Sequence, residues 1–60
     1  METDEERAIR YRYRADEVQT LAAITGDDQT REALLTVAGH YESMARAIED
    51  LMKIKRFLGH

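Results

Sequence analysis

The chain has 60 residues, contains no cysteine and carries a formal net charge of −3 at pH 7. A chain of this length forms at most one domain, and the lack of cysteine excludes disulfides and thiolate chemistry. The negative net charge makes nucleic acid an unexpected partner, because nucleic-acid-binding domains are normally basic. The sequence shows neither a long apolar run nor a basic start followed by an apolar block. We therefore expect no membrane span, no signal peptide and a cytoplasmic location.

Residues 4–24 are expected to form the first helix. Thr3 and Glu6 have the spacing of a capping box, in which each side chain accepts a hydrogen bond from the other residue's backbone amide. The apolar residues that follow recur at intervals of three and four, which places them on one face of a helix. They are Ala8, Tyr11, Ala15, Val18, Leu21 and Ala22.

Residues 25–28 are expected to form the turn. Gly26 is placed to adopt the left-handed conformation that often closes a helix, because it has no Cβ to clash. Asp28 then follows as the expected N-cap of the next helix. So short a connection leaves an antiparallel neighbour as the natural arrangement.

Residues 29–58 are expected to form the second and longer helix, with apolar residues again at intervals of three and four. These residues are Leu34, Val37, Ala38, Tyr41, Met44, Ala45, Ile48, Leu51 and Met52. The predicted fold is all-α, a single antiparallel two-helix hairpin over residues 1–60. In this hairpin the acidic start of the first helix lies near Lys53, Lys55 and Arg56.

The two helices cannot cover all of their apolar side chains. The second helix is longer by about 15 Å at the rise of an α-helix, so its last turns project past the first helix. Surplus apolar surface on a small helical chain usually indicates a partner. We predict a two-fold dimer that forms a four-helix bundle, with a tetramer or contact with a different protein as alternatives. The predicted interface residues are Ile9, Tyr13, Leu35, Ile54, Phe57 and Leu58.

Four arginines alternate with other residues near the start of the chain and form a candidate anion-binding segment. They are Arg7, Arg10, Arg12 and Arg14, interleaved with two tyrosines that are able to stack on bases. The favoured interpretation is structural, because Glu6, Asp16 and Glu17 lie at spacings that pair with arginines along a helix. A weak nucleic-acid or anionic-surface binder is the alternative function.

No catalytic constellation is evident in the sequence. His40 lacks the glutamate three residues earlier that a helix-borne di-metal site requires, since Val37 is there. Neither a serine in a glycine-rich elbow nor a phosphate-binding loop is present. We therefore expect a non-enzymatic interaction or regulatory module with no cofactor and no bound metal. A metal site shared between subunits around His40 and Glu42 is the third and least favoured hypothesis.

A longer pattern runs through both predicted helices. The first half consists of Tyr11, Arg14, Ala15, Glu17, Val18, Leu21 and Ala22, and the second of Arg31, Leu34, Leu35, Ala38, Tyr41, Met44 and Ala45. The pattern resembles that of short uncharacterised alphaproteobacterial proteins, in which an Asp-Pro turn joins the two halves. Here Asp28-Gln29 replaces Asp-Pro. The resemblance implies a helical hairpin and no particular activity.

Overall fold

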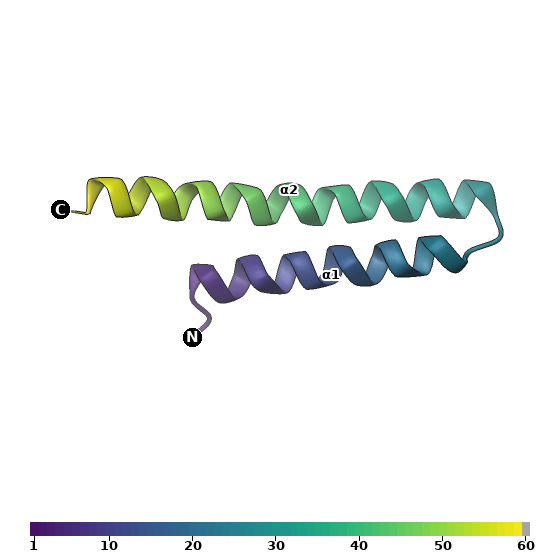
Figure 1. The fold of residues 1–60 in the computed structure, drawn as a ribbon, viewed down its shortest axis with the longest axis horizontal. Helices are drawn as coiled ribbons and strands as arrows, with labels where there is room; N and C mark the ends of the chain where they lie inside the picture. The colour runs from purple at the N-terminus through teal and green to yellow at the C-terminus, as the bar shows by residue number, and fades with distance from the viewer. Residues whose placement is uncertain (60) are drawn as a thin grey trace.

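The computed structural model describes residues 1–59 as two α-helices lying side by side in opposite directions. Helix α1 comprises Asp4–Ile24 and helix α2 comprises Asp28–Leu58 (Figure 1). The part of the chain that is described contains no β-strand. The predicted all-α hairpin is confirmed, while His60 lies outside the described residues.

Helix α2 is the longer helix and projects beyond the start of α1. It has 31 residues against 21 in α1, and the molecule measures 51 × 18 × 13 Å. Figure 1 shows the last turns of α2 extending past the N-terminus without a neighbouring helix. The predicted overhang is therefore present, and it carries Ile54, Phe57 and Leu58.

The start of α1 is held by the predicted capping box. The Glu6 N–H donates to Thr3 Oγ1 at 3.1 Å, and the Thr3 N–H donates to Glu6 Oε1 at 2.8 Å. Asp4, Glu5 and Glu6 occupy the first turn, where negative charge interacts favourably with the helix dipole.

The turn differs from the prediction at both of its expected capping residues. Helix α2 begins one residue early, since Asp27 is the N-cap and its carboxylate accepts the Thr30 N–H at 2.8 Å. The prediction of Asp28 as N-cap is therefore wrong. Two consecutive aspartates are equally able to cap, and the helix includes the second of them as its first residue.

Gly26 does not adopt the left-handed conformation, because no described residue has a positive φ angle. Thr25 ends α1 instead, in an extended conformation. Its N–H donates to the Ala22 carbonyl at 3.3 Å and its hydroxyl to the Leu21 carbonyl at 2.7 Å. Arg31 Nη2 then donates to the Thr25 carbonyl at 3.1 Å, which ties the turn to α2. The Leu21 and Ala22 carbonyls at the end of α1 therefore accept hydrogen bonds without a glycine cap.

The core between the helices consists of alanine. The buried residues are Ala8, Ala15 and Ala22 on α1 and Ala38 and Ala45 on α2, each at most 3 % exposed. On each helix the alanines are seven residues apart, and half-buried side chains such as Val18 and Tyr41 lie between them. Alternating steps of three and four residues define the heptad seam of a coiled coil. We call the α2 side of this contact, residues Leu34, Ala38, Tyr41, Ala45, Ile48 and Met52, the inner seam.

Four larger residues of the predicted packing faces lie outside this core. Leu21, Val37, Met44 and Leu51 are between 39 and 51 % exposed. An alanine side chain is a single methyl group, so the contact between the helices is narrow and covers little beyond the seam itself. Side chains one position to the side of the seam therefore remain in contact with solvent.

Candidate interaction surface

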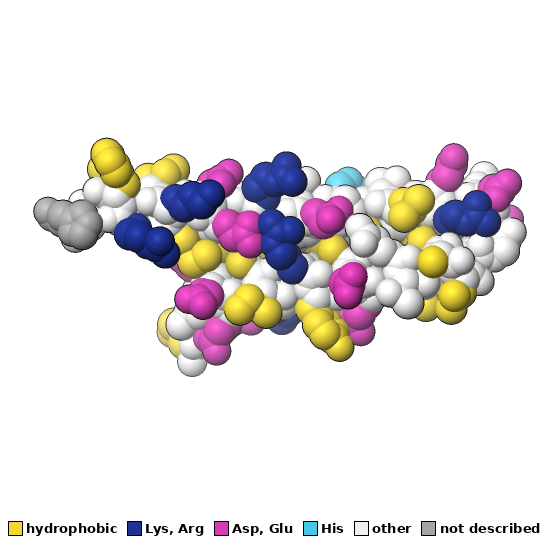
Figure 2. All heavy atoms as spheres, viewed as in Figure 1, with side chains coloured by type: hydrophobic (Ala, Val, Ile, Leu, Met, Phe, Trp, Pro, Cys, Tyr) yellow, Lys and Arg dark blue, Asp and Glu magenta, His cyan; other side chains and the backbone are white. Residues whose placement is uncertain are grey.

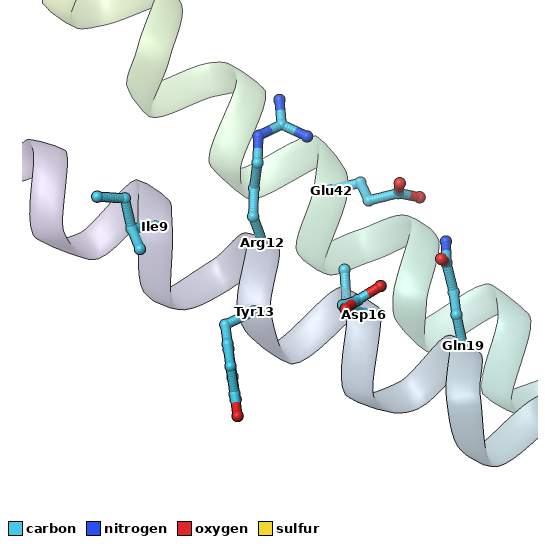
Figure 3. Close-up of a pocket in the computed structure, with 7 residues that line it drawn as sticks. Ile9, Arg12, Tyr13, Asp16, Gln19 and Glu42 are labelled. Atoms are coloured by element: carbon cyan, nitrogen blue, oxygen red, sulfur yellow. The ribbon is translucent and has the colours of Figure 1, made fainter.

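One flank of the hairpin is charged and joins the two helices directly. Arg12 of α1 donates from Nε and Nη2 to the two carboxylate oxygens of Glu49 of α2, at 2.9 and 2.7 Å. This bidentate hydrogen bond lowers the pKa of Glu49 below its ordinary value of 4.5. Figure 3 shows Arg12 extending from α1 toward α2. In Figure 2 charged side chains lie across the junction of the helices on this face.

A second link joins the start of α1 to the projecting end of α2. Lys55 Nζ donates to the Asp4 carboxylate at 2.9 Å, and this hydrogen bond lowers the pKa of Asp4 below its ordinary value of 3.8. The predicted proximity of the acidic start to the basic end is confirmed for this pair. Together with the link between Arg12 and Glu49, it fixes how far the two helices are shifted along each other.

The candidate anion-binding arginines do not form one positive surface. Glu2 accepts hydrogen bonds from Arg10 at 2.8 and 3.0 Å and also lies 3.9 Å from Arg7. Arg14 lies 3.6 Å from Glu17, which was one of the predicted pairs, whereas Arg12 reaches α2 instead. Each of the four guanidinium groups therefore has a carboxylate partner within 4 Å.

The tyrosines beside these arginines have different surroundings. The Arg10 guanidinium lies over the Tyr11 ring, 5.0 Å from its centroid, and the Tyr11 and Tyr41 rings are 6.0 Å apart. Tyr11 is thus packed at the helix contact, while Tyr13 is exposed and points away from α2 in Figure 3. Only one of the two tyrosines is free to meet a ligand ring.

Two shallow, open grooves lie along α1. The first, of about 360 Å³, runs beside Ile9, Tyr13 and Asp16 and reaches Glu42 of α2 (Figure 3). The second, of about 450 Å³, shares Tyr13 and Asp16 and continues to Leu21. Neither has the enclosed apolar shape that small-molecule sites usually have.

The predicted interface residues are all exposed but do not lie together. Phe57 is 83 % exposed, and Ile54 and Leu58 lie beside it on the projecting end of α2. Ile9 and Tyr13 lie on α1, and Leu35 is near the turn on the other helix. The structure of one chain therefore separates these residues into three groups.

An exposed, mostly apolar surface runs along α2 and was not distinguished in the sequence. It has two rows, and we call their combination the outer seam. One row is Val37, Met44, Leu51 and Leu58, and the other is Ala33, His40, Ala47 and Ile54. Seven of these eight residues are apolar, with His40 as the exception.

The outer seam has the same periodicity as the inner seam. Val37, Met44 and Leu51 each directly precede a member of the inner seam, and so do Ala33, His40 and Ala47 of the second row. A step of one residue rotates a side chain by about 100° around an α-helix. Helix α2 therefore carries two heptad seams about 100° apart, of which α1 covers one. A prediction that accepts any interval of three or four residues places both seams on one apolar face. Requiring the two intervals to alternate strictly separates the inner seam from the outer seam.

Known proteins give no guide to this surface, because no family model, curated protein or solved structure matches the chain. No helix within residues 1–59 is long and apolar enough to cross a membrane. In the same range no three His, Cys, Asp or Glu side chains gather as ligands for a metal ion.

Proposed function

We propose that the chain is a non-enzymatic, self-associating interaction module, in which two hairpins form a four-helix bundle. The observation that carries this proposal is the contrast between the core and the surface. Within residues 1–59 the five buried residues are all alanines, whereas twelve large hydrophobic side chains are exposed. Burying a methyl group contributes about 0.8 kcal/mol, so five of them provide only about 4 kcal/mol before any loss of chain entropy is counted.

The accessible surface supports the same proposal. The chain exposes 4874 Å² for a mass of 7.0 kDa. A compact monomer of this mass exposes about 4,000 Å². The excess is roughly 800 Å², which is about the area that each partner contributes to a standard protein–protein interface. A second hairpin is therefore of the right size to cover it.

The arrangement of α2 also favours a bundle. A helix in a four-helix bundle packs against two neighbours on adjacent sides. The two heptad seams of α2, about 100° apart, provide two such sides, and only one is occupied within the hairpin. This pattern is typical of a bundle helix rather than of a helix that belongs to an isolated hairpin.

Thermal unfolding over a hundredfold range of protein concentration tests self-association. If the folded state is a dimer and the unfolded state a single chain, Tm rises with concentration by mass action. We expect such a rise, together with a single cooperative transition. A Tm that is independent of concentration over this range would contradict the proposal.

The alternative function, binding of nucleic acid or of an anionic surface through Arg7, Arg10, Arg12 and Arg14, has less support. The carboxylate partners of these arginines already neutralise the segment. Genuine phosphate binding weakens steeply with salt. Binding to a fluorescent RNA oligomer at low salt that is lost on replacing Arg10 and Arg14 by alanine would revive this function.

A further inference from the structure

We propose that two copies of α2 pack against each other in antiparallel orientation along the outer seam. This inference rests on the proposed self-association and adds the surface, the direction and the register. The outer seam spans residues 33–58, which is about 38 Å at the rise of an α-helix. Val37, Met44 and Leu51, near its middle, are 39–46 % exposed, so a second helix would bury them further.

The matching flank of α1 does not offer a comparable surface. Arg7 and Arg14 occupy the places along α1 that correspond to the outer seam, and Leu21 is the only large apolar residue in that row. The apolar contact between copies therefore belongs to α2. Helix α1 lies beside it on the outside of the bundle and contributes Leu21 and Ile24 at one end.

Charge favours the antiparallel direction. The last turns of α2 are basic, with Lys53 and Arg56 exposed, and its start is acidic, with Asp27, Asp28 and Glu32 exposed. An antiparallel pair places the basic end of each copy beside the acidic start of the other. A parallel pair would bring the like charges and the like ends of the helix dipoles together.

The extent of overlap between the two outer seams selects one register. With the two-fold axis between Ala45 and Arg46, Met44 of one copy faces Ala47 of the other. In the same register Leu58 faces Ala33 of the second copy. Each alanine of the outer seam thus lies opposite a large side chain, as close packing of a seam requires. All eight members of the seam are paired in this register, whereas a shift of one heptad leaves two of them without a partner.

The remaining layers of this register are also defined. Val37 of one copy faces Ile54 of the other, and His40 faces Leu51. His40 is the one polar residue in the contact, so a leucine in its place would bury two additional apolar side chains per dimer. We expect His40→Leu to tighten the dimer at least tenfold, whereas Thr20→Leu, on the outer side of α1, leaves the dimer constant unchanged.

Cysteine pairs test the surface and the direction together, because the chain has no cysteine of its own. We would prepare Val37→Cys and Ile54→Cys as separate proteins and oxidise each alone and as an equal mixture. In the proposed register Val37 lies opposite Ile54 of the other copy, while two copies of Val37 are separated by about 25 Å along the axis. A disulfide requires Cα atoms about 4.4–6.8 Å apart. The mixture should yield at least tenfold more cross-linked dimer than either variant alone.

A matched control uses the opposite flank of α2. Leu35→Cys and Arg56→Cys lie at levels that also meet across the proposed two-fold axis, and both residues are exposed, but they face away from the outer seam. Their mixture should form no dimer above the level of the single variants. Efficient cross-linking of this pair would place the contact on the other flank.

The outcomes separate this inference from the proposed function. Cross-linking of Val37→Cys with itself would indicate a parallel contact and overturn the inference. Failure of all the mixtures to cross-link, with a dimeric mass for the untreated proteins, would overturn the outer seam but leave self-association intact. A monomeric mass at every concentration would overturn both, and would direct the search to a helix from a different protein.

Discussion

The alanine core predicts that a larger side chain at Ala22 destabilises the protein. Ala22 is 2 % exposed and lies between the helices, whereas its neighbour Ala23 is exposed on the same helix. Replacing either residue by leucine adds the same three carbon atoms and makes the same small change in helix propensity. Only Ala22→Leu places these atoms within the seam.

The structure limits how far the seam can adjust. The end of α1 is fixed by hydrogen bonds from Thr25 to Ala22 and from Arg31 to Thr25, so the helices cannot easily separate at this level. Overpacking of a close contact costs about 1–3 kcal/mol. For a chain of this size each 1 kcal/mol lowers Tm by about 4–8 °C. We therefore expect Ala22→Leu to lower Tm by about 8–16 °C, at about 2 kcal/mol.

The assay is thermal unfolding by circular dichroism at one fixed protein concentration, with Ala23→Leu as the control. The control should change Tm by no more than about 2 °C, because leucine is nearly as good a helix former as alanine. Equal Tm values for the two variants would refute the idea that the helices meet through an alanine seam.

Three further results are expected from the contacts at the helix ends and on the charged flank. Thr3→Ala removes the N-cap of α1 and should reduce stability by about 1 kcal/mol, as measured by urea denaturation. Glu49→Gln should lower Tm slightly at low salt, and the difference from the unmodified protein should disappear at high salt because exposed ion pairs are screened. A difference that persists at high salt would contradict this interpretation. Stability should also decrease as the pH is lowered. Carboxyl groups whose pKa is lowered by folding stabilise the protein at pH values above their unfolded pKa values, which are about 4.5 for Glu and 3.8 for Asp. They lose this stabilising effect as the pH falls through their lower folded pKa values. The groups concerned are Glu2, Asp4, Asp27 and Glu49. A urea midpoint that is unchanged between pH 6 and pH 3 would contradict the assignment of these pairs.

The hairpin could be predicted from the sequence because several local features agree. The capping box at Thr3, the interruption at residues 25–28 and the spacing of apolar residues all indicate two helices joined by a short turn. The predicted N-cap of α2, Asp28, differs by one residue from the observed N-cap, Asp27, because the two aspartates are chemically equivalent.

The composition of the core was harder to predict. A face defined by intervals of three and four includes Val37, Met44 and Leu51, but the contact with α1 is as narrow as a two-residue heptad seam. Hydrophobicity also favours the larger side chains as core residues, whereas the fully buried positions of the seam are alanines, which allow close approach. The distinction depends on how near the helices come, which is a property of the packed pair.

The candidate surface could be predicted only in part. Ile54 and Leu58 belong both to the predicted interface and to the outer seam. Val37, Met44 and Leu51 are instead among the residues predicted for the packing face between the helices, and His40 appears only in the least favoured metal-site hypothesis. The pairing of Arg12 with Glu49 across 37 positions of sequence depends on the register of the two helices. Spacing along a single helix therefore could not identify it.

The most direct test of the account is the mass of the protein in solution, measured by light scattering across a concentration series at neutral pH. The account predicts a mass of about 14 kDa, twice the 7.0 kDa of one chain, with dissociation only on dilution. It also predicts that Leu51→Asp, on the outer seam, shifts the measured mass toward that of a single chain more strongly than Phe57→Asp, which lies outside the seam. A mass of one chain at every concentration would contradict the central claim that this exposed apolar surface is covered by a second copy.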